Sequence, residues 1–398
     1  MSSNGAALFA FALPLHMLAS SYALAIWLLF TIFSLILGGY SWTDFVLNIR
    51  TSRSIFLLVF LYILLLFGLF ISDDVKEGLS KIEVSIPFIV APFLFLSNKN
   101  FIKINRIINA FISGLFCSVV FSIIKLSIDG NLSIDGFYAD FDLFHHSSYY
   151  SMLMNIAIAL FLFLYDKINF SSISRYVCIA IFSVLVFLIS SKAGAVVLIS
   201  LFLVKSIQVI KSSSSLYPKL FFLSFLVFFS VVLVLNKRVQ NMVSNVENIV
   251  LQDEPIYPTE STAIRWKIWE KSIKLINKSV FFGYGTGDAN AQLLKAYNQE
   301  PYLLRHIIKK KYNAHNTFFQ LWIMIGFLGP LIVVALLFFV LKKHRYSYFS
   351  IGLVLIFTIN FCLESMLERH AGVMIFTFFI SLTIVCKDLP FFQHKISR

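Results

Sequence analysis

Polar side chains that could do chemistry gather between Thr262 and Gly329, a long polar interval in an otherwise apolar chain. Arg265 stands near its start, in the first turn of a predicted helix. An isolated arginine there is often a plain surface residue, but its planar guanidinium with five N–H donors can also hold a diphosphate. His315 and Asn316 stand near the end of the interval, where the chain enters an apolar run. By position alone, His315 could be an ordinary interfacial histidine.

Two further polar groups border apolar runs earlier in the chain. His145 and His146 precede an apolar run, and Tyr149 follows one turn later. These residues are either polar residues of the membrane interface or substrate contacts. Lys192 separates two apolar runs, and a lysine at the bilayer centre costs about 2.5–3.5 kcal/mol. Lys192 is therefore expected at the outer surface or in a polar cavity, either as a snorkelling side chain or as a cation that meets an anionic ligand.

The composition indicates which elements position these groups. Hydrophobic residues make up 59% of the chain and charged residues 13%, against about 45–50% and 25% in soluble domains. The chain is therefore predicted to be an all-α polytopic membrane protein, because helices satisfy their own backbone where water is absent. Windows of roughly 17–25 apolar residues predict about 12 transmembrane helices, near residues 5–20, 21–38, 54–71, 82–97, 107–128, 147–165, 176–190, 193–210, 219–236, 315–341, 347–363 and 370–386.

Lys and Arg predict the orientation of these helices. With the N-terminus in the cytoplasm, 16 of these residues fall in inner loops and the C-terminal tail, and 5 fall in short outer segments. Basic residues accumulate on the cytoplasmic side, so both termini are predicted to be cytoplasmic. The chain then divides into nine transmembrane helices over 1–236, an extracytoplasmic active-site loop with short helices over 237–314, and three transmembrane helices with a cytoplasmic tail over 315–398.

Several other classes of site are not indicated. The net charge of +13 is explained by the topology signal and by anionic lipid, and needs no nucleic acid. The four cysteines lie in apolar runs without metal-ligand spacing, so neither a disulfide framework nor a zinc site is expected. Gly283, Gly285 and Gly287 do not complete a dinucleotide fingerprint and are interpreted as a helix-ending turn. We expect no metal and no cofactor.

One spacing resembles a known family. His315-Asn316, followed after nine residues by Gly326 and after two more by Gly329, is similar to the signature of the O-antigen ligases, in the O-antigen ligase and polymerase superfamily. From helical spacing alone, the two glycines would be a close-packing face.

Other segments agree with this resemblance in order and kind. Arg265-Trp266 resembles the superfamily's loop arginine, His145 to Tyr149 resembles its His-x-x-Tyr region, and Glu364 to Gly372 resembles its closing Glu-rich outer turn. Where the family commonly has Ser-Arg, this chain has Ser191-Lys192. Lysine keeps the charge but loses the bidentate fork.

The resemblance implies an inverting, metal-independent glycosyltransferase in the bacterial inner membrane. It would move a glycan from a polyprenyl-diphosphate carrier to an acceptor hydroxyl. In that reaction His315 would act as the base, and Arg265 with Lys192 would stabilise the leaving diphosphate. Asn316 would anchor the loop or touch sugar.

The resemblance leaves the acceptor open. A ligase would transfer to lipid A–core in lipopolysaccharide biosynthesis, whereas a polymerase would transfer to another lipid-linked repeat unit. A transporter or flippase of lipid-linked sugars is the alternative from another class. Such proteins usually show paired broken helices and internal repeats, and neither is found in this sequence.

Overall fold

The computed structural model describes residues 2–37, 42–141, 143–165, 168, 170–189, 191–212, 216, 220, 261–301 and 304–386. In these residues every regular element is a helix, which confirms the all-α prediction. The predicted span at 219–236 falls almost wholly outside the described residues, as do the first part of the expected loop and the C-terminal tail. The helices, in chain order, are α1 (Ser2–Ala12), α2 (Met17–Ile36), α3 (Trp42–Thr51), η1 (Arg53–Ile55), α4 (Phe56–Phe70), α5 (Val75–Ser85), α6 (Pro87–Asn98), η2 (Lys99–Phe101), α7 (Ile104–Ile128), α8 (Ile134–Ala139), α9 (Ser147–Phe163), α10 (Ser172–Leu188), α11 (Lys192–Ser212), α14 (Ser261–Lys278), α15 (Ala289–Tyr297), α16 (Arg305–Lys310), α17 (Thr317–Ile325), α18 (Leu328–Lys343), α19 (Tyr348–Leu363), η4 (Met366–Glu368) and α20 (His370–Val385).

Many of these helices are apolar enough for a multi-pass membrane protein. Among the described residues, 5 helical segments are long and apolar enough to cross a membrane, namely Met17–Ile36, Arg53–Phe70, Val75–Phe101, Ile104–Ile128 and Lys192–Lys211. The shorter apolar helices α9, α10, α19 and α20 accompany them.

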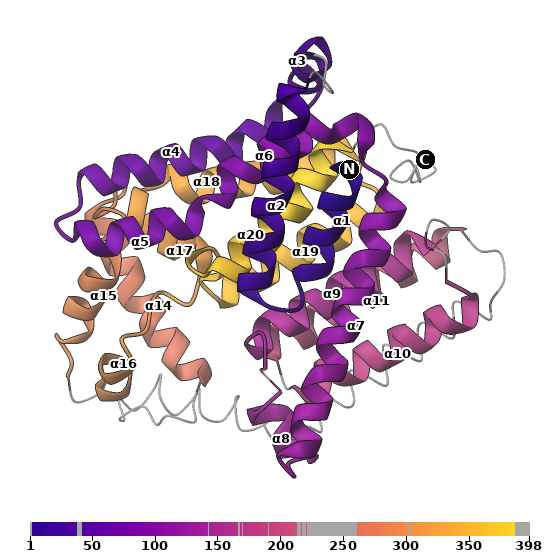
Figure 1. Cartoon of the computed structure of the whole chain (residues 1–398). Helices are drawn as coiled ribbons and strands as arrows, with labels where there is room; N and C mark the ends of the chain where they lie inside the picture. Colours follow the sequence, from indigo (N-terminus) through magenta and orange to yellow (C-terminus); the bar gives the residue numbers. More distant parts are fainter. Residues whose placement is uncertain are drawn as a thin grey trace.

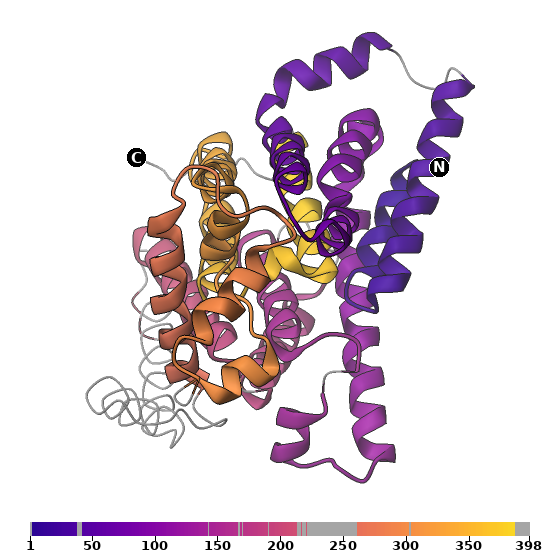
Figure 2. The same ribbon diagram turned by 90° about the vertical axis from the view of Figure 1, so that its left-hand side faces the viewer.

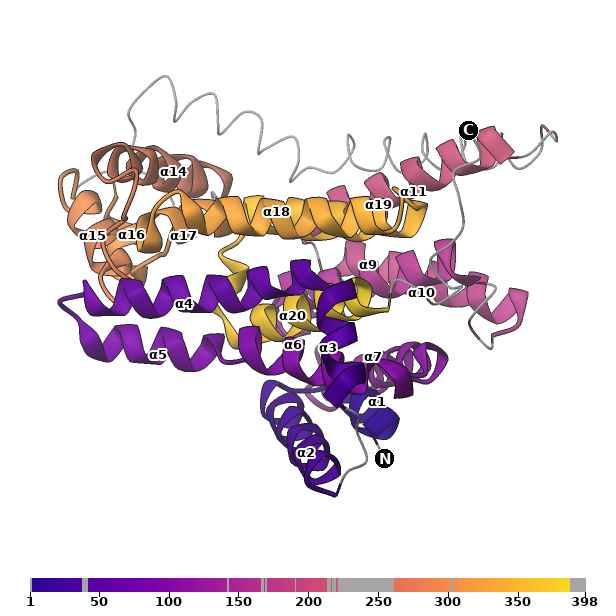
Figure 3. The ribbon, with the colours of Figure 1, turned by 90° about the horizontal axis from the view of Figure 1, so that it is seen from above.

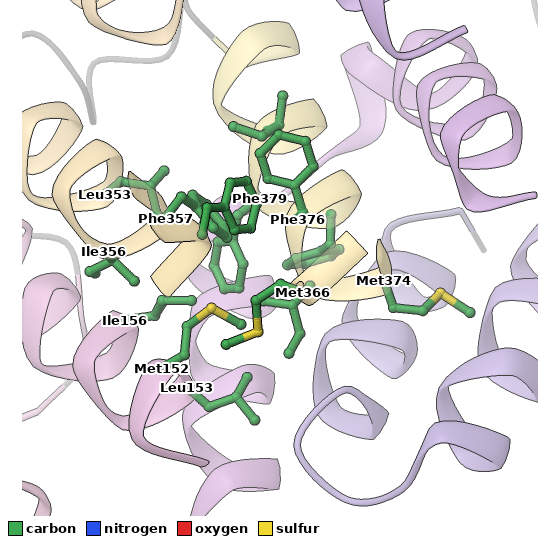
Figure 4. Packing of buried hydrophobic residues seen from close by; sticks show 14 of the residues in the cluster. Met152, Leu153, Ile156, Leu353, Ile356, Phe357, Met366, Met374, Phe376 and Phe379 are labelled. Atoms are coloured by element: carbon green, nitrogen blue, oxygen red, sulfur yellow. The ribbon is translucent and has the colours of Figure 1, made fainter. Parts of the chain in front are cut away.

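The centre of the bundle is formed by α9 and α20, which are apolar on all sides. A helix with no polar face must be enclosed by other helices, and nearly every residue of both helices is buried. Figure 4 shows Met152 and Ile156 of α9 close to Met366 of η4, with Phe357 of α19 and Phe376 of α20 beside them. This core holds the turn between α19 and α20 in place.

The elements that carry the polar residues lie at one end of the bundle. Seen from above, α14, α15 and α16 cluster beside α17, while α4, α5 and α18 run lengthwise next to one another (Figure 3). The same cluster is seen at the lower left of Figure 1, at the end of the bundle away from α10. The N-terminal helices α1 and α2 lie on the opposite side of the molecule from this cluster (Figure 2).

Two predicted helix boundaries are wrong. The first span was placed at 5–20, but α1 ends at Ala12 and α2 begins at Met17. Pro14 lies in the turn between them, where its missing N–H does no harm. The single span predicted at 315–341 is two helices, α17 and α18, because Gly326 ends α17 with a φ of 72°. A left-handed φ favours glycine, which carries no Cβ.

The glycine-rich segment explains this break. It forms a turn between α14 and α15, as the sequence predicts, and it packs against the end of α17. The N–H groups of Tyr284 and Gly285 donate to the carbonyls of Ile323 and Met324 at 2.8 Å and 3.0 Å. A Cβ on Gly326 would lie 2.0 Å from the carbonyl oxygen of Phe281, which directly precedes the glycines. Gly326 therefore allows the loop and the helix to approach closely, rather than two membrane helices.

Candidate active site

Three segments that are distant in sequence meet at the candidate site: α14, the residues just before α17, and the turn between α19 and η4. Asn316 fixes this meeting. It is the N-cap of α17, and asparagine is favoured there because its oxygen satisfies a free backbone N–H. Its Oδ1 accepts from the N–H of Phe319 at 3.0 Å, and its Nδ2 donates to the carbonyl of Cys362 at 3.1 Å. The structure thus gives Asn316 an anchoring role.

His315 is held at the end of the loop in an uncommon backbone conformation. Its φ is 44°, a left-handed value that costs a non-glycine residue about 1–3 kcal/mol unless the surroundings hold it. Its N–H donates to Oδ1 of Asn313 at 3.1 Å, and its carbonyl accepts from the indole of Trp269 at 3.4 Å. The imidazole packs edge-on against Tyr312, with the ring centroids 5.0 Å apart. Its side chain is 21% exposed, so the ring is both fixed and accessible.

Glu364 joins His315 to Arg265. One carboxylate oxygen lies 2.9 Å from Nδ1 of His315, and the other lies 2.5 Å from a terminal nitrogen of Arg265. Nε of Arg265 also donates to the carbonyl of Leu363 at 3.1 Å. The candidate base and the candidate diphosphate-binding cation therefore share one carboxylate.

The carboxylate of Glu364 is ionised at neutral pH. Burial alone would raise its pKa, but His315 and Arg265 outweigh burial and hold the pKa of Glu364 at about 2. An ionised carboxylate accepts hydrogen bonds and cannot donate, so Nδ1 of His315 carries the proton of this bond. In the neutral ring Nε2 is then unprotonated and can accept a proton.

Lys192 lies next to the helix that carries Arg265. Its Nζ donates to the hydroxyl of Thr262 at 2.8 Å, so the first residue of α11 contacts the first turn of α14. Thr262 and Arg265 are three residues apart on α14 and share one face. The structure therefore brings Lys192 and Arg265 to the same edge of the site, and Lys192 as a whole is exposed.

His145 and His146 have structural partners. His145 is buried, and its Nε2 donates to the carbonyl of Leu13 at 3.0 Å. Burial lowers the pKa of His145 to about 4, although that hydrogen bond works in the opposite direction. His146 is the N-cap of α9 and accepts weakly from the N–H of Ser148 at 3.4 Å. These contacts tie α9 to the end of α1 and do not reach His315.

Tyr149 lies near the turn that follows α19. It is near enough to Glu364, Glu368 and Arg369 to interact with their charges. The two histidines and Tyr149 therefore have different surroundings. His145 supports the fold, whereas Tyr149 interacts with charged residues of the turn that follows α19.

A second carboxylate, Glu368, lies four residues after Glu364 and is more deeply buried, with 5% of its side chain exposed. It pairs with Lys81 of α5 at 2.9 Å. A cavity between α4, α5, α17 and η4 adjoins this pair. Its lining comprises Leu65, Lys81, Val84, Ser85, Phe88, Thr317, Gln320, Leu321, Met324, Ser365, Leu367 and Glu368.

Sequence reasoning placed Glu364 in a family-like turn but gave it no role, and it did not single out Glu368 or Lys81. A signal was present, since ionisable residues beside apolar spans are costly and usually pair with one another.

Within the described ranges, no group of three or more His, Cys, Asp or Glu side chains could hold a metal ion.

Residues 177–334 match the family model described as O-antigen ligase. The resemblance to the O-antigen ligases is confirmed. The matched region runs from α10 into the first half of α18, so it includes Lys192, Arg265, His315 and Asn316, while Glu364 lies beyond it. No curated protein matches the chain.

The match supports a glycosyltransferase-type enzyme of the O-antigen ligase and polymerase superfamily, with a lipid-linked glycan as substrate and a glycan acceptor. Together with the apolar helices, it supports a multi-pass membrane protein.

Proposed function

We propose that this protein is an O-antigen ligase-type transferase of lipopolysaccharide biosynthesis. It moves a glycan from a polyprenyl-diphosphate carrier to a hydroxyl of lipid A–core, at the periplasmic face of the bacterial inner membrane. The family match supports the class of enzyme. Within that class, the proposal rests mainly on the shared carboxylate, with His315 and Arg265 on its two oxygens.

In this proposal His315 is the general base. Glu364 holds the proton on Nδ1, so Nε2 accepts the proton of the acceptor hydroxyl as its oxygen attacks the anomeric carbon. The new C–O bond forms on the face opposite the diphosphate, the bond from the anomeric carbon to the phosphate oxygen breaks, and polyprenyl diphosphate leaves. Such a base contributes about 10²–10⁴-fold, or roughly 3–5 kcal/mol of the barrier.

Arg265 and Lys192 are proposed to bind the diphosphate. Negative charge grows on the leaving phosphate, and fixed cations aimed at that charge stabilise the transition state without a metal ion. Two nitrogens of Arg265 are engaged by Glu364 and by the carbonyl of Leu363. A diphosphate would therefore compete with Glu364 for the guanidinium. In this proposal Lys192 adds a second cation from α11, and Tyr149 contacts the substrate from α9.

The proposed orientation follows the distribution of basic residues, with both termini in the cytoplasm and residues 237–314 in the periplasm. The donor's polyprenyl chain would lie in the outer leaflet of the inner membrane, beside α14. The acceptor would approach from the periplasm.

The test is the lipid-linked material that accumulates in membranes lacking this protein. Loss of a ligase leaves full-length polymer on the carrier, whereas loss of a polymerase leaves single repeat units. Accumulated polymer that is cleared by the wild-type gene but not by His315→Ala supports the proposal. Accumulated single repeat units would instead indicate a polymerase. Lipid-linked sugar that stays at the cytoplasmic face would instead indicate a flippase.

A further inference from the structure

Glu368 is the hub of a buried hydrogen-bond network. Its Oε1 accepts from Nζ of Lys81 at 2.9 Å, from Nε2 of Gln320 at 3.0 Å and from Nδ2 of Asn290 at 3.4 Å. Its Oε2 accepts from Nδ2 of Asn313. A buried charge is stable only when it is paired and hydrogen-bonded. This carboxylate has both an ammonium and three amide donors.

Two of these amides also hold the backbone on the N-terminal side of His315. Asn313 donates to Glu368 and accepts, through Oδ1, from the N–H of His315 at 3.1 Å. Gln320 donates to Glu368 and accepts, through Oε1, from the N–H of Ala314 at 2.9 Å. Two consecutive backbone N–H groups, at 314 and 315, are thus fixed by side chains that share one anchor.

This arrangement accounts for the backbone of His315. A φ of 44° persists in a histidine only where its surroundings impose it. Asn313 and Gln320 supply that constraint, and Glu368 fixes the orientation of both amides by accepting from their nitrogens. Without that acceptor, the amide of Asn313 could rotate and release the N–H of His315, whereas Gln320 would still donate from Nε2 to Oδ1 of Asn290 at 3.1 Å.

We propose that Glu368 is a positioning residue for His315, acting through Asn313 and Gln320, with Lys81 balancing its charge. This inference rests on the proposed function, in which His315 is the base. Glu368 itself does not touch the reacting atoms. Glutamine cannot replace it, because the network uses both carboxylate oxygens as acceptors and glutamine offers one.

The experiment compares Glu368→Gln with Glu300→Gln in the full chain, purified in lipid nanodiscs. Glu300 is a matched control, since it also pairs with a lysine, Lys271, and its backbone hydrogen bonds go to Tyr297 and Leu304 rather than to residues 313–315. Two quantities are measured: the single-turnover transfer rate with donor affinity determined separately, and the rate at which diethyl pyrocarbonate modifies His315, followed by mass spectrometry. His16, the N-cap of α2, serves as an internal reference for labelling.

Glu368→Gln is expected to lower the transfer rate by about a hundredfold, because small displacements of a catalytic group have effects of this size. Donor affinity should stay at the parental value, and labelling of His315 should rise severalfold relative to His16. Glu300→Gln should leave all three quantities near parental. A Glu368→Gln protein with parental transfer and parental labelling would overturn the proposal, as would an equal loss in Glu300→Gln.

Asn313→Ala provides a second test if Glu368→Gln does not insert. It removes the same link to His315 and leaves the pair of Lys81 and Glu368 intact, so labelling of His315 should rise and transfer should fall. Parental values for both in Asn313→Ala overturn the proposal. Labelling also separates the two claims. If His315→Ala transfers normally, the proposed base is wrong, yet a change of His315 labelling in Glu368→Gln still shows that Glu368 positions it.

Discussion

Glu364 and Glu368 are four residues apart in sequence, but they lie in different surroundings. Glu364 is 19% exposed, and its partners are a histidine and an arginine that the proposed reaction uses. Glu368 is 5% exposed, and its partners are a lysine and three amides that hold the backbone. The comparison separates two tasks. A partly exposed carboxylate can exchange a partner for substrate, whereas a buried one with several donors keeps its neighbours fixed.

Replacing Glu364 should lower transfer as much as replacing Glu368 does, and more than replacing Arg265. A glutamine amide can donate to Nδ1 of His315 as well as accept from it, so in Glu364→Gln the ring proton is no longer held on Nδ1. Nε2 is then no longer kept free to act as the base, and transfer should fall by about a hundredfold. Arg265 loses its competitor, so donor affinity should rise rather than fall. Single-turnover rates and donor binding in nanodiscs check both points, with Glu270→Gln on α14 as the control. Weaker donor binding in Glu364→Gln would show that Glu364 does not compete with the diphosphate.

Arg265→Lys should have the next largest effect. Lysine keeps the charge, but it cannot offer two coplanar N–H groups to a phosphate or to Glu364 and Leu363 together. Transfer should fall by about tenfold, equivalent to roughly 1.4 kcal/mol, and donor affinity should fall as well. Parental transfer in a variant that inserts normally would reduce Arg265 to a structural partner of Glu364.

The smallest expected effect is on stability and depends on pH. The pKa of Glu364 lies at about 2, below the ordinary 4.5, so its pairing stabilises the fold above pH 4.5. This stability is lost as the pH falls through about 2. The difference in Tm between the wild type and Glu364→Gln should therefore be largest near neutral pH and shrink from about pH 5 downward. A difference that stays constant with pH would contradict the assigned ion pairs.

Much of the fold could be predicted from the sequence, because hydropathy is a local property. The apolar runs that became α4, α7, α9, α10, α11, α19 and α20 were all visible. The break at Gly326 was not, since a glycine in an apolar run indicates close packing and a chain break equally well. Only the contact with the segment at 281–285 decides between them.

The candidate site was less predictable, because it depends on contacts between segments that are distant in sequence. Residue type and spacing singled out His315, Arg265 and Lys192. The sequence did not show that one carboxylate joins two of them, because Glu364 lies 49 residues from His315 and 99 from Arg265. His145 was a candidate substrate contact in the sequence, but the structure buries it against a backbone carbonyl, whereas His315 meets a carboxylate.

The most direct test of the whole account is the effect of His315→Ala on single-turnover transfer from purified donor to purified acceptor, with donor affinity measured separately. His306 lies in the same loop and contacts Tyr312, so His306→Ala is the matched control. We predict a folded His315→Ala protein with parental donor affinity and transfer reduced by at least about a hundredfold. Near-parental transfer, or a loss explained entirely by failed donor binding, would contradict the assignment of His315 as the base.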